Sequence, residues 1–246
     1  MKKQSYTFRH GLRDGLPIGF GYLSVSFGFG IAVVSAGLPS LVALLISMTN
    51  ETSAGQLAGL TVILALGSLP EMALTQLVIN LRYSLMAITL SQRLDESFTT
   101  PWRLLLSFSI TDEIFAVAST KTDRIGVKYF SGLATAPYIG WTLGTLLGAL
   151  AGTLLPAVIR DALGLILYGM FISIIIPPAR RERGVLFAVC TAVGLSCILY
   201  YVPLFDFISA GFALIISAVI AAALAAWLFP AARPREDTPK EVSAHD

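Results

Sequence analysis

The sequence predicts an all-α integral membrane protein with about eight transmembrane helices. Of its 246 residues, 55% are hydrophobic and only 13% are charged, whereas a soluble domain carries about 25% charged residues. The mean hydropathy is +0.76. A net charge of +2 without a basic stripe gives no basis for nucleic-acid binding. Most of the chain is therefore expected to lie in a bilayer.

Eight apolar segments, separated by short polar breaks, carry this prediction. They lie near 15–36, 40–68, 72–92, 104–120, 129–155, 162–178, 185–202 and 207–229. No linker is long enough to divide the chain, so residues 1–246 are expected to form a single polytopic membrane domain. Residues 1–14 would be a cytoplasmic N-terminus, and residues 231–246 a flexible cytoplasmic tail. The first segment exceeds the apolar core of a signal peptide, about 7–15 residues, so we expect an uncleaved first span.

The Lys and Arg residues predict the orientation, because they favour the cytoplasmic side of a membrane. With the N-terminus inside and eight crossings, the cytoplasmic side receives Lys2, Lys3, Arg9, Arg13, Lys121, Arg124, Lys128, Arg180, Arg181, Arg183, Arg233, Arg235 and Lys240. Arg93, Arg103 and Arg160 then fall outside, and Arg82 lies within a span. This bias predicts that both termini are cytoplasmic.

The second apolar segment is interrupted at its centre. Residues 49–55 read T-N-E-T-S-A-G, and these residue types favour turns and caps over helix interiors. We interpret the segment as a broken span made of two half-helices, which is how transporters expose backbone groups to charged substrates. The alternative is a polar extracellular loop between two shorter helices.

Four ionisable residues fall inside predicted spans, where each is costly unless it faces a partner or water. They are Glu51, Arg82, Asp112 and Glu113. Arg82 is expected to pair with a buried acid or to bind a carboxylate, and a purely structural ion pair remains an alternative. Asp112 and Glu113 are adjacent, so they point about 100° apart on a helix and cannot face one cavity equally well.

A glycine stripe marks the fifth apolar segment. Gly140, Gly144, Gly148 and Gly152 recur every four residues, which lets another helix approach closely within the membrane. The stripe predicts helix packing, and it leaves open whether the partner helix belongs to this chain or to another.

The residue inventory argues against an enzyme. The two histidines, His10 and His245, lie outside the predicted spans, so no intramembrane serine–histidine pair is available. The chain has neither a zinc-binding H-E-x-x-H motif nor a P-loop for ATP. We therefore expect neither a metal nor a cofactor.

Several short motifs, in order along residues 11 to about 155, resemble the AzlC family, the large subunit of branched-chain amino acid exporters. They are D-G-L-P-I-G-F-G near the start, S-A-G-Q at 53–56, N-L-R at 80–82, T-D-E at 111–113 and the glycine stripe. This sequence has T-N-E-T at 49–52, where the family often has small and aromatic residues. That departure bears on the identity of the substrate.

The resemblance implies export of leucine, isoleucine, valine and methionine from a bacterial cell through its inner membrane. It also implies proton antiport and a small membrane partner that resembles AzlD. Fold, substrates and partner are expectations at this point.

The candidate site combines opposite charges, because an amino acid is a zwitterion. Arg82, Asn80 and the backbone around Ser53, Ala54, Gly55 and Gln56 are expected to bind the substrate carboxylate. Glu51 or Asp112 would face the ammonium group, and proton coupling would involve Glu51, Asp112 or Glu113. Two other functions remain open, namely a non-transporting scaffold or assembly subunit that packs through the glycine stripe, and a cation or proton channel.

Overall fold

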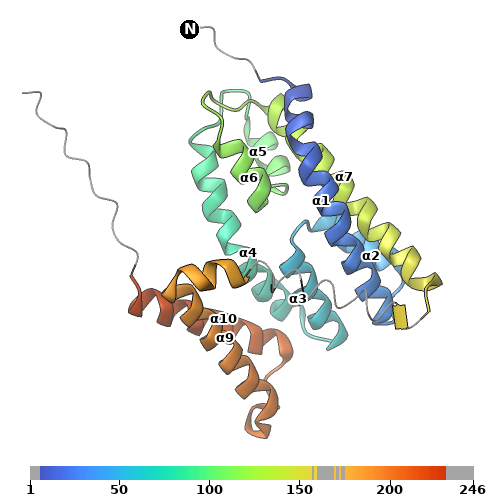
Figure 1. The fold of residues 1–246 in the computed structure, drawn as a ribbon, viewed down its shortest axis with the longest axis vertical. Coiled ribbons are helices and arrows are strands. Elements are labelled where there is room, and N and C mark those ends of the chain that lie inside the picture. Colours follow the sequence, from blue (N-terminus) through green and yellow to red (C-terminus); the bar gives the residue numbers. More distant parts are fainter. Residues whose placement is uncertain (1–5, 157, 160–168, 170–171, 173–174, 231–246) are drawn as a thin grey trace, which may run out of the picture.

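A computed structural model describes residues 6–156, 158–159, 169, 172 and 175–230, and this part of the chain is helical (Figure 1). Its helices are α1 (Phe8–Ser35), α2 (Ser40–Thr49), α3 (Ser53–Leu64), α4 (Leu69–Ser91), α5 (Thr100–Ser107), α6 (Asp112–Ser119), α7 (Val127–Leu154), α9 (Arg183–Tyr201) and α10 (Ala210–Leu228), with a 3-10 turn at Pro203–Phe205. Five of these, α1, α4, α7, α9 and α10, are long and apolar enough to cross a membrane. The predictions for residues 1–5, for the tail 231–246 and for most of the segment 162–178 lie outside the described residues.

Helices α1 and α7 form the most extensive helix–helix contact of the described residues and run parallel, side by side, along one edge of the fold (Figure 1). A Cβ atom at Gly140, Gly144 or Gly148 would meet the backbone of Gly19, Leu23 or Phe27, respectively. The α7 glycines and the α1 residues that they contact both recur every four positions, so the glycine stripe lies along one face of α1. The predicted packing role is confirmed, and the partner helix belongs to the same chain.

Helices α2 and α3 form a hairpin, which we call hairpin 1 (residues 40–64). The amide of Gln56 on α3 donates to the Ser47 hydroxyl on α2 at 2.9 Å, and Leu60 and Ala43 share one apolar cluster. The chain therefore turns back on itself between the two helices. The turn is stabilised by the Asn50 side chain, whose Oδ1 accepts from the Thr52 N–H at 2.9 Å.

This geometry corrects the predicted second span. The break lies within the predicted residues, but the second half returns toward its starting side instead of continuing across. A ten-residue helix such as α2 is about 15 Å long, half the bilayer's apolar core of about 30 Å.

Helices α5 and α6 form a second hairpin, hairpin 2 (residues 100–119), which enters from the opposite side. The segments that flank it are bonded together, because the Asp95 N–H donates to the Ile125 carbonyl at 3.0 Å and the Ile125 N–H donates to the Arg93 carbonyl at 2.9 Å. The Arg93 guanidinium also reaches the Ser119 carbonyl at 2.6 Å. Both ends of hairpin 2 therefore lie on one side.

The predicted single span over 104–120 is consequently wrong, and so is the placement of Arg93 and Arg103 opposite Lys121. Residues 40–68 and 104–120 do not each cross the membrane, so the count of eight crossings fails at these two segments. The physical reason is that the polar stretch from Ser107 to Thr111 interrupts the helix and reverses the chain.

The first six helices consist of two similar units in opposite orientation. Each unit is a long helix followed by a hairpin, with α1 preceding hairpin 1 and α4 preceding hairpin 2. The end of α4 packs near the start of α7, since Leu90 clusters with Tyr129 and Phe130, so α4 runs antiparallel to α1. The turns of the two hairpins consequently approach each other near the middle of the fold.

Helices α9 and α10 pack against each other, and α10 contacts α4. The contact to α4 is polar, because buried Glu71 accepts hydrogen bonds from the Ser209 hydroxyl and from the Gly211 N–H, the latter at 2.9 Å. The carboxylate thus occupies the N-terminal end of α10, where negative charge is favourable. Glu71 therefore attaches α10 to the rest of the helical core.

Candidate functional site

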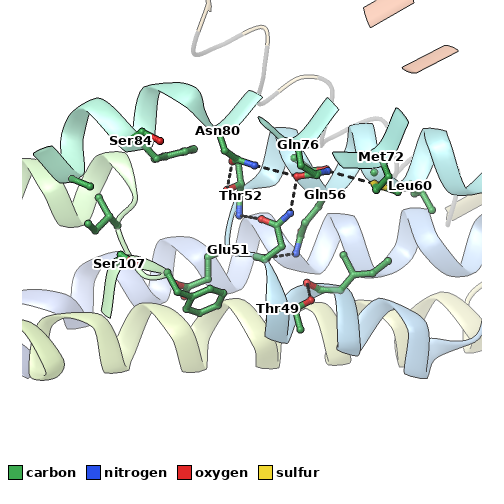
Figure 2. A pocket seen from close by; sticks show the side chains of 18 of the residues that line it. Thr49, Glu51, Thr52, Gln56, Leu60, Met72, Gln76, Asn80, Ser84 and Ser107 are labelled. Atoms are coloured by element: carbon green, nitrogen blue, oxygen red, sulfur yellow. Dashed lines mark hydrogen bonds between the residues drawn. The ribbon is translucent and has the colours of Figure 1, made fainter. Parts of the chain in front are cut away.

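Two cavities meet at the turns of the hairpins. The smaller cavity, about 610 Å³, lies between hairpin 1, α4 and the turn of hairpin 2 (Figure 2). The larger cavity, about 790 Å³, lies between hairpin 1, α1, α4 and the start of α6. Glu51 and Tyr83 line both cavities. The turn of hairpin 1 is therefore the boundary between them.

Glu51 lies in the extended turn between α2 and α3. Its side chain is buried, with the residue only 5% exposed. Within the described part of the chain, neither carboxyl oxygen has a hydrogen-bond partner, and Ser109 of hairpin 2 is the polar residue that approaches it. A buried carboxyl group without a fixed partner is costly, so this position favours a mobile partner such as a proton or an ammonium group.

The N-terminus of α3 begins beside Glu51 and has no side-chain cap among the described residues. Its N-cap residue is Thr52, whose hydroxyl donates to Oδ1 of Asn80 at 3.0 Å instead of accepting from the first turn. The amides of Ser53 and Ala54 therefore begin an uncapped helix at the wall of the larger cavity. Uncapped amides and the helix dipole favour a bound anion there.

A chain of neutral amides attaches the turn of hairpin 1 to α4. Gln76 is at its centre, since it accepts from Asn50 at 3.3 Å and from Asn80 at 3.1 Å and donates to the Gly55 carbonyl at 2.8 Å (Figure 2). Gln56 donates to the Asn50 carbonyl at 2.7 Å. The side-chain nitrogens of Asn80 and Gln56, both predicted to bind substrate, are thus engaged in holding the turn.

The adjacent acids at the start of α6 point to different helices, as their spacing predicts. Asp112 forms an ion pair with Arg82 of α4, with an N–O distance of 2.8 Å. Glu113 instead accepts from the Tyr22 hydroxyl of α1 at 2.5 Å. The predicted pairing of Arg82 with an intramembrane acid is therefore present. The side chains of Arg82 and Asp112 are 55% and 41% exposed, so they remain accessible from the larger cavity.

The predicted site residues divide between the two cavities. Ser53, Ala54, Arg82, Asp112 and Glu113 line the larger cavity, Gly55, Gln56 and Asn80 line the smaller one, and Glu51 lines both. The glycines of the α7 stripe pack against α1 instead.

The sequence-based prediction missed Tyr22, Gln76 and Trp141. The aromatic side chains resemble ordinary packing residues in an apolar helix. Gln76 had a usable signal, since it is an amide within an apolar run and lies four residues before Asn80.

These features define a class of protein, a multi-pass helical membrane protein with a polar site enclosed by two opposed hairpins. The chain belongs to the AzlC family, because the sequence profile described as "AzlC protein" matches residues 17–155. The match runs from α1 to the end of α7 and includes both hairpins. This family of membrane proteins is associated with branched-chain amino acid transport.

Individual relatives agree with this assignment. The chain is 33% identical to "Inner membrane protein YgaZ" of Escherichia coli K12, over 82% of this chain and 84% of the relative. It is 30% identical to an "Uncharacterized membrane protein" of Archaeoglobus fulgidus, over 71% of this chain and 77% of the relative. No solved structure matches the chain. The YgaZ match and the candidate spans confirm the predicted location in the inner membrane.

Proposed function

We propose that this protein is a secondary transporter that exports branched-chain amino acids, namely leucine, isoleucine and valine, together with methionine, in exchange for protons. The observation that carries the proposal is Glu51, a buried carboxyl group without a fixed partner, beside the uncapped N-terminus of α3. Opposite charges lie close together in an amino acid, and this hairpin turn presents a complementary pair of groups in the same arrangement.

The substrate ammonium group binds Glu51, and the carboxylate binds the first amides of α3 together with Arg82. The guanidinium of Arg82 contacts Asp112 and the Tyr83 hydroxyl through one nitrogen, Nη2. Its other N–H groups, on Nη1 and Nε, can bind a carboxylate while the ion pair persists. Apolar side chains that line the smaller cavity, such as Ile46, Leu60 and Met72, would contact the aliphatic side chain of the substrate.

Proton exchange follows from competition at one carboxylate. Glu51 can hold either a proton or the substrate ammonium group, so binding one displaces the other. Asp112 and Glu113 face the larger cavity and alter the field at the site, and their own protonation offers a second route for coupling.

The proposed topology keeps both termini in the cytoplasm. Hairpins 1 and 2 each enter and leave on one side of the membrane. Compared with eight crossings, this topology has two crossings fewer, so the C-terminus stays on the same side. Arg93 and Arg103 then move to the cytoplasmic side, next to Lys121, in agreement with the preference of Lys and Arg for that side. Asp14 forms an ion pair with Lys121 at 2.8 Å, which supports a cytoplasmic position for the start of α1 as well.

A small AzlD-like membrane subunit is the proposed partner, as the family resemblance implies. The glycine stripe is covered by α1 and is not its binding surface. The partner would therefore bind elsewhere on the lipid-facing helices.

Counterflow of labelled leucine in proteoliposomes tests the proposal. The purified protein, alone or with an AzlD-like small subunit, should accumulate labelled leucine against preloaded unlabelled leucine, and valine should compete. An inward proton gradient should accelerate efflux of preloaded leucine. Absence of counterflow under both conditions, with folded protein in the vesicles, would reject the transport function.

A further inference from the structure

Two aromatic side chains connect the turns of the two hairpins. Trp141 of α7 donates its indole N–H to the carbonyl of Asn50, the residue that precedes Glu51, at 3.2 Å. Tyr22 of α1 places its hydroxyl 2.5 Å from Glu113 and 2.6 Å from the Thr111 hydroxyl oxygen, both in hairpin 2. The Tyr22 and Trp141 rings meet edge to face, with centroids 5.1 Å apart.

This connection is buried and rests on a stiff support. Tyr22 is 8% exposed and Trp141 is 2% exposed. They project from α1 and α7, which glycines hold in close backbone contact along their length. The two rings are therefore held in contact, because the two helices have little room to separate.

The Tyr22 hydroxyl responds to the charge of Glu113. The hydroxyl has one proton, which it donates to Glu113 while that carboxylate is ionised. A protonated Glu113 can instead donate its proton to the Tyr22 oxygen, and the Tyr22 proton can then be donated to Thr111, whose hydroxyl oxygen lies 2.6 Å from the Tyr22 hydroxyl. The other charged groups near this position are Asp112 on the same helix, Arg82 through its pair with Asp112, and Glu51 of hairpin 1.

We infer that Tyr22 and Trp141 are positioning residues that couple the protonation of Glu113 to substrate binding at Glu51. Tyr22 responds to the charge of Glu113, and Trp141, together with Gln56, holds the backbone carbonyl next to Glu51. The inference rests on the proposed amino acid–proton exchange and assigns it a physical connection between the two hairpins. Neither aromatic side chain needs to carry a proton.

This coupling is tested by substitutions that keep an aromatic ring at each position. Tyr22→Phe removes only the hydroxyl, and Trp141→Phe removes the indole N–H. The matched control is Tyr129→Phe, which removes a tyrosine hydrogen bond, 2.7 Å to Asp14, that joins α7 to α1 away from the hairpin turns. Two rates are measured in proteoliposomes, namely leucine counterflow without a gradient and leucine efflux with and without an inward proton gradient.

Both ring variants should keep counterflow within about twofold of wild type while the stimulation by the gradient falls at least about fivefold, the low end of coupling between sites. Tyr129→Phe should keep both. Tyr22→Phe with Glu113→Gln should behave like Glu113→Gln alone, because both changes break one connection.

Full gradient stimulation in both ring variants would overturn the inference, and so would additive losses in the double variant. Loss of counterflow in both, with folded protein, would also overturn it, since the residues would then serve binding itself. If Tyr22→Phe does not fold, Trp141→Phe decides the outcome alone. Wild-type protein without counterflow would instead contradict the proposed function.

Discussion

Hairpins 1 and 2 have the same architecture but different chemistry at their turns. Hairpin 1 is held by neutral amides around Gln76 and presents an uncapped helix beside one carboxyl group, Glu51. In hairpin 2, the Thr111 hydroxyl accepts from the Ile114 N–H and caps the helix, and the acids of the first turn contact charged or hydroxyl groups. The turn of hairpin 1 therefore has polar groups without fixed partners, whereas the acids at the turn of hairpin 2 are paired.

The two hairpins also differ in how many of their residues are buried. Hairpin 1 has fully buried positions on both helices, including Ala43, Ser47 and Gln56. Helix α5 of hairpin 2 has no buried residue, and Leu104 and Leu105 are exposed. Regions with few buried contacts open at low free energy. Helix α6 of hairpin 2 buries Ile114 and Ala118, so we expect α5 to be the part of the two hairpins that moves most easily.

The largest expected effect is a reversal of sidedness at the loops beside the hairpins. In a background with Cys190→Ala and Cys197→Ala, Glu96→Cys should react with an impermeant thiol reagent only from the cytoplasmic side. Ala65→Cys, at the end of hairpin 1, should react only from outside. Eight crossings would give the opposite result at both positions, and that result would exclude opposed hairpins.

Neutralising the Glu51 carboxyl group should cause the next largest effect, a loss of leucine affinity. Glu51→Gln removes a charge-assisted hydrogen bond to the substrate ammonium group, so leucine affinity should fall about 10- to 100-fold. Glu71→Gln changes a second buried glutamate, which contacts α10, and should leave affinity near wild type. Binding is measured by calorimetry in detergent. Equal affinity of Glu51→Gln and wild type would remove Glu51 from the site.

Variants of Arg82 distinguish two roles of this residue, namely binding the substrate carboxylate and neutralising Asp112 of hairpin 2. Arg82→Ala should reduce leucine efflux about 10-fold or more at matched protein level, because it removes donors to the carboxylate. It also leaves Asp112 without its ion-pair partner. Adding Asp112→Asn should restore the yield of folded protein but not the efflux. Restored efflux in the double variant would show that Arg82 serves only to neutralise Asp112.

The sequence predicted the helical membrane class, the break at residues 49–55, the glycine packing and the pairing of Arg82 with an acid. It could not predict that either hairpin turns back, because periodicity contains no information on direction. The bond from Gln56 to Ser47 that fixes hairpin 1 is a tertiary contact. Segment 104–120 has the length of a single span, and its break from Ser107 to Thr111 is too short to indicate a turn.

Other contacts were missed because each residue type has an ordinary local explanation. Glu71 follows Leu69-Pro70 and was assigned to a polar break between spans, although it is buried against α10. Tyr22 and Trp141 lie in glycine-rich apolar helices, where aromatic residues usually serve packing. Only the approach of the two hairpin turns gives these side chains polar partners.

A smaller effect is expected from loosening hairpin 1. Gln76→Leu removes the hydrogen bonds to Asn50, Gly55 and Asn80, so the free energy of unfolding should fall by about 1–3 kcal/mol, and leucine affinity should fall less than in Glu51→Gln. Thermal unfolding in detergent and leucine binding provide the measurements. Gln92→Leu, on the exposed end of α4, is the matched control. A larger loss of affinity than in Glu51→Gln would mean that Gln76 itself contacts substrate.

Protection of Ser53→Cys from alkylation tests whether an amino acid binds at the turn of hairpin 1. The variant is made without Cys190 and Cys197, and its alkylation by a small thiol reagent is timed with and without leucine. Ser196→Cys, in the separate cavity between α9 and α10, provides the reference rate. We expect leucine to slow alkylation at position 53 in proportion to the occupancy of the site. The alkylation rate at position 196 should stay unchanged. Equal rates at position 53, at leucine concentrations that saturate transport by the same variant, would contradict binding at this turn.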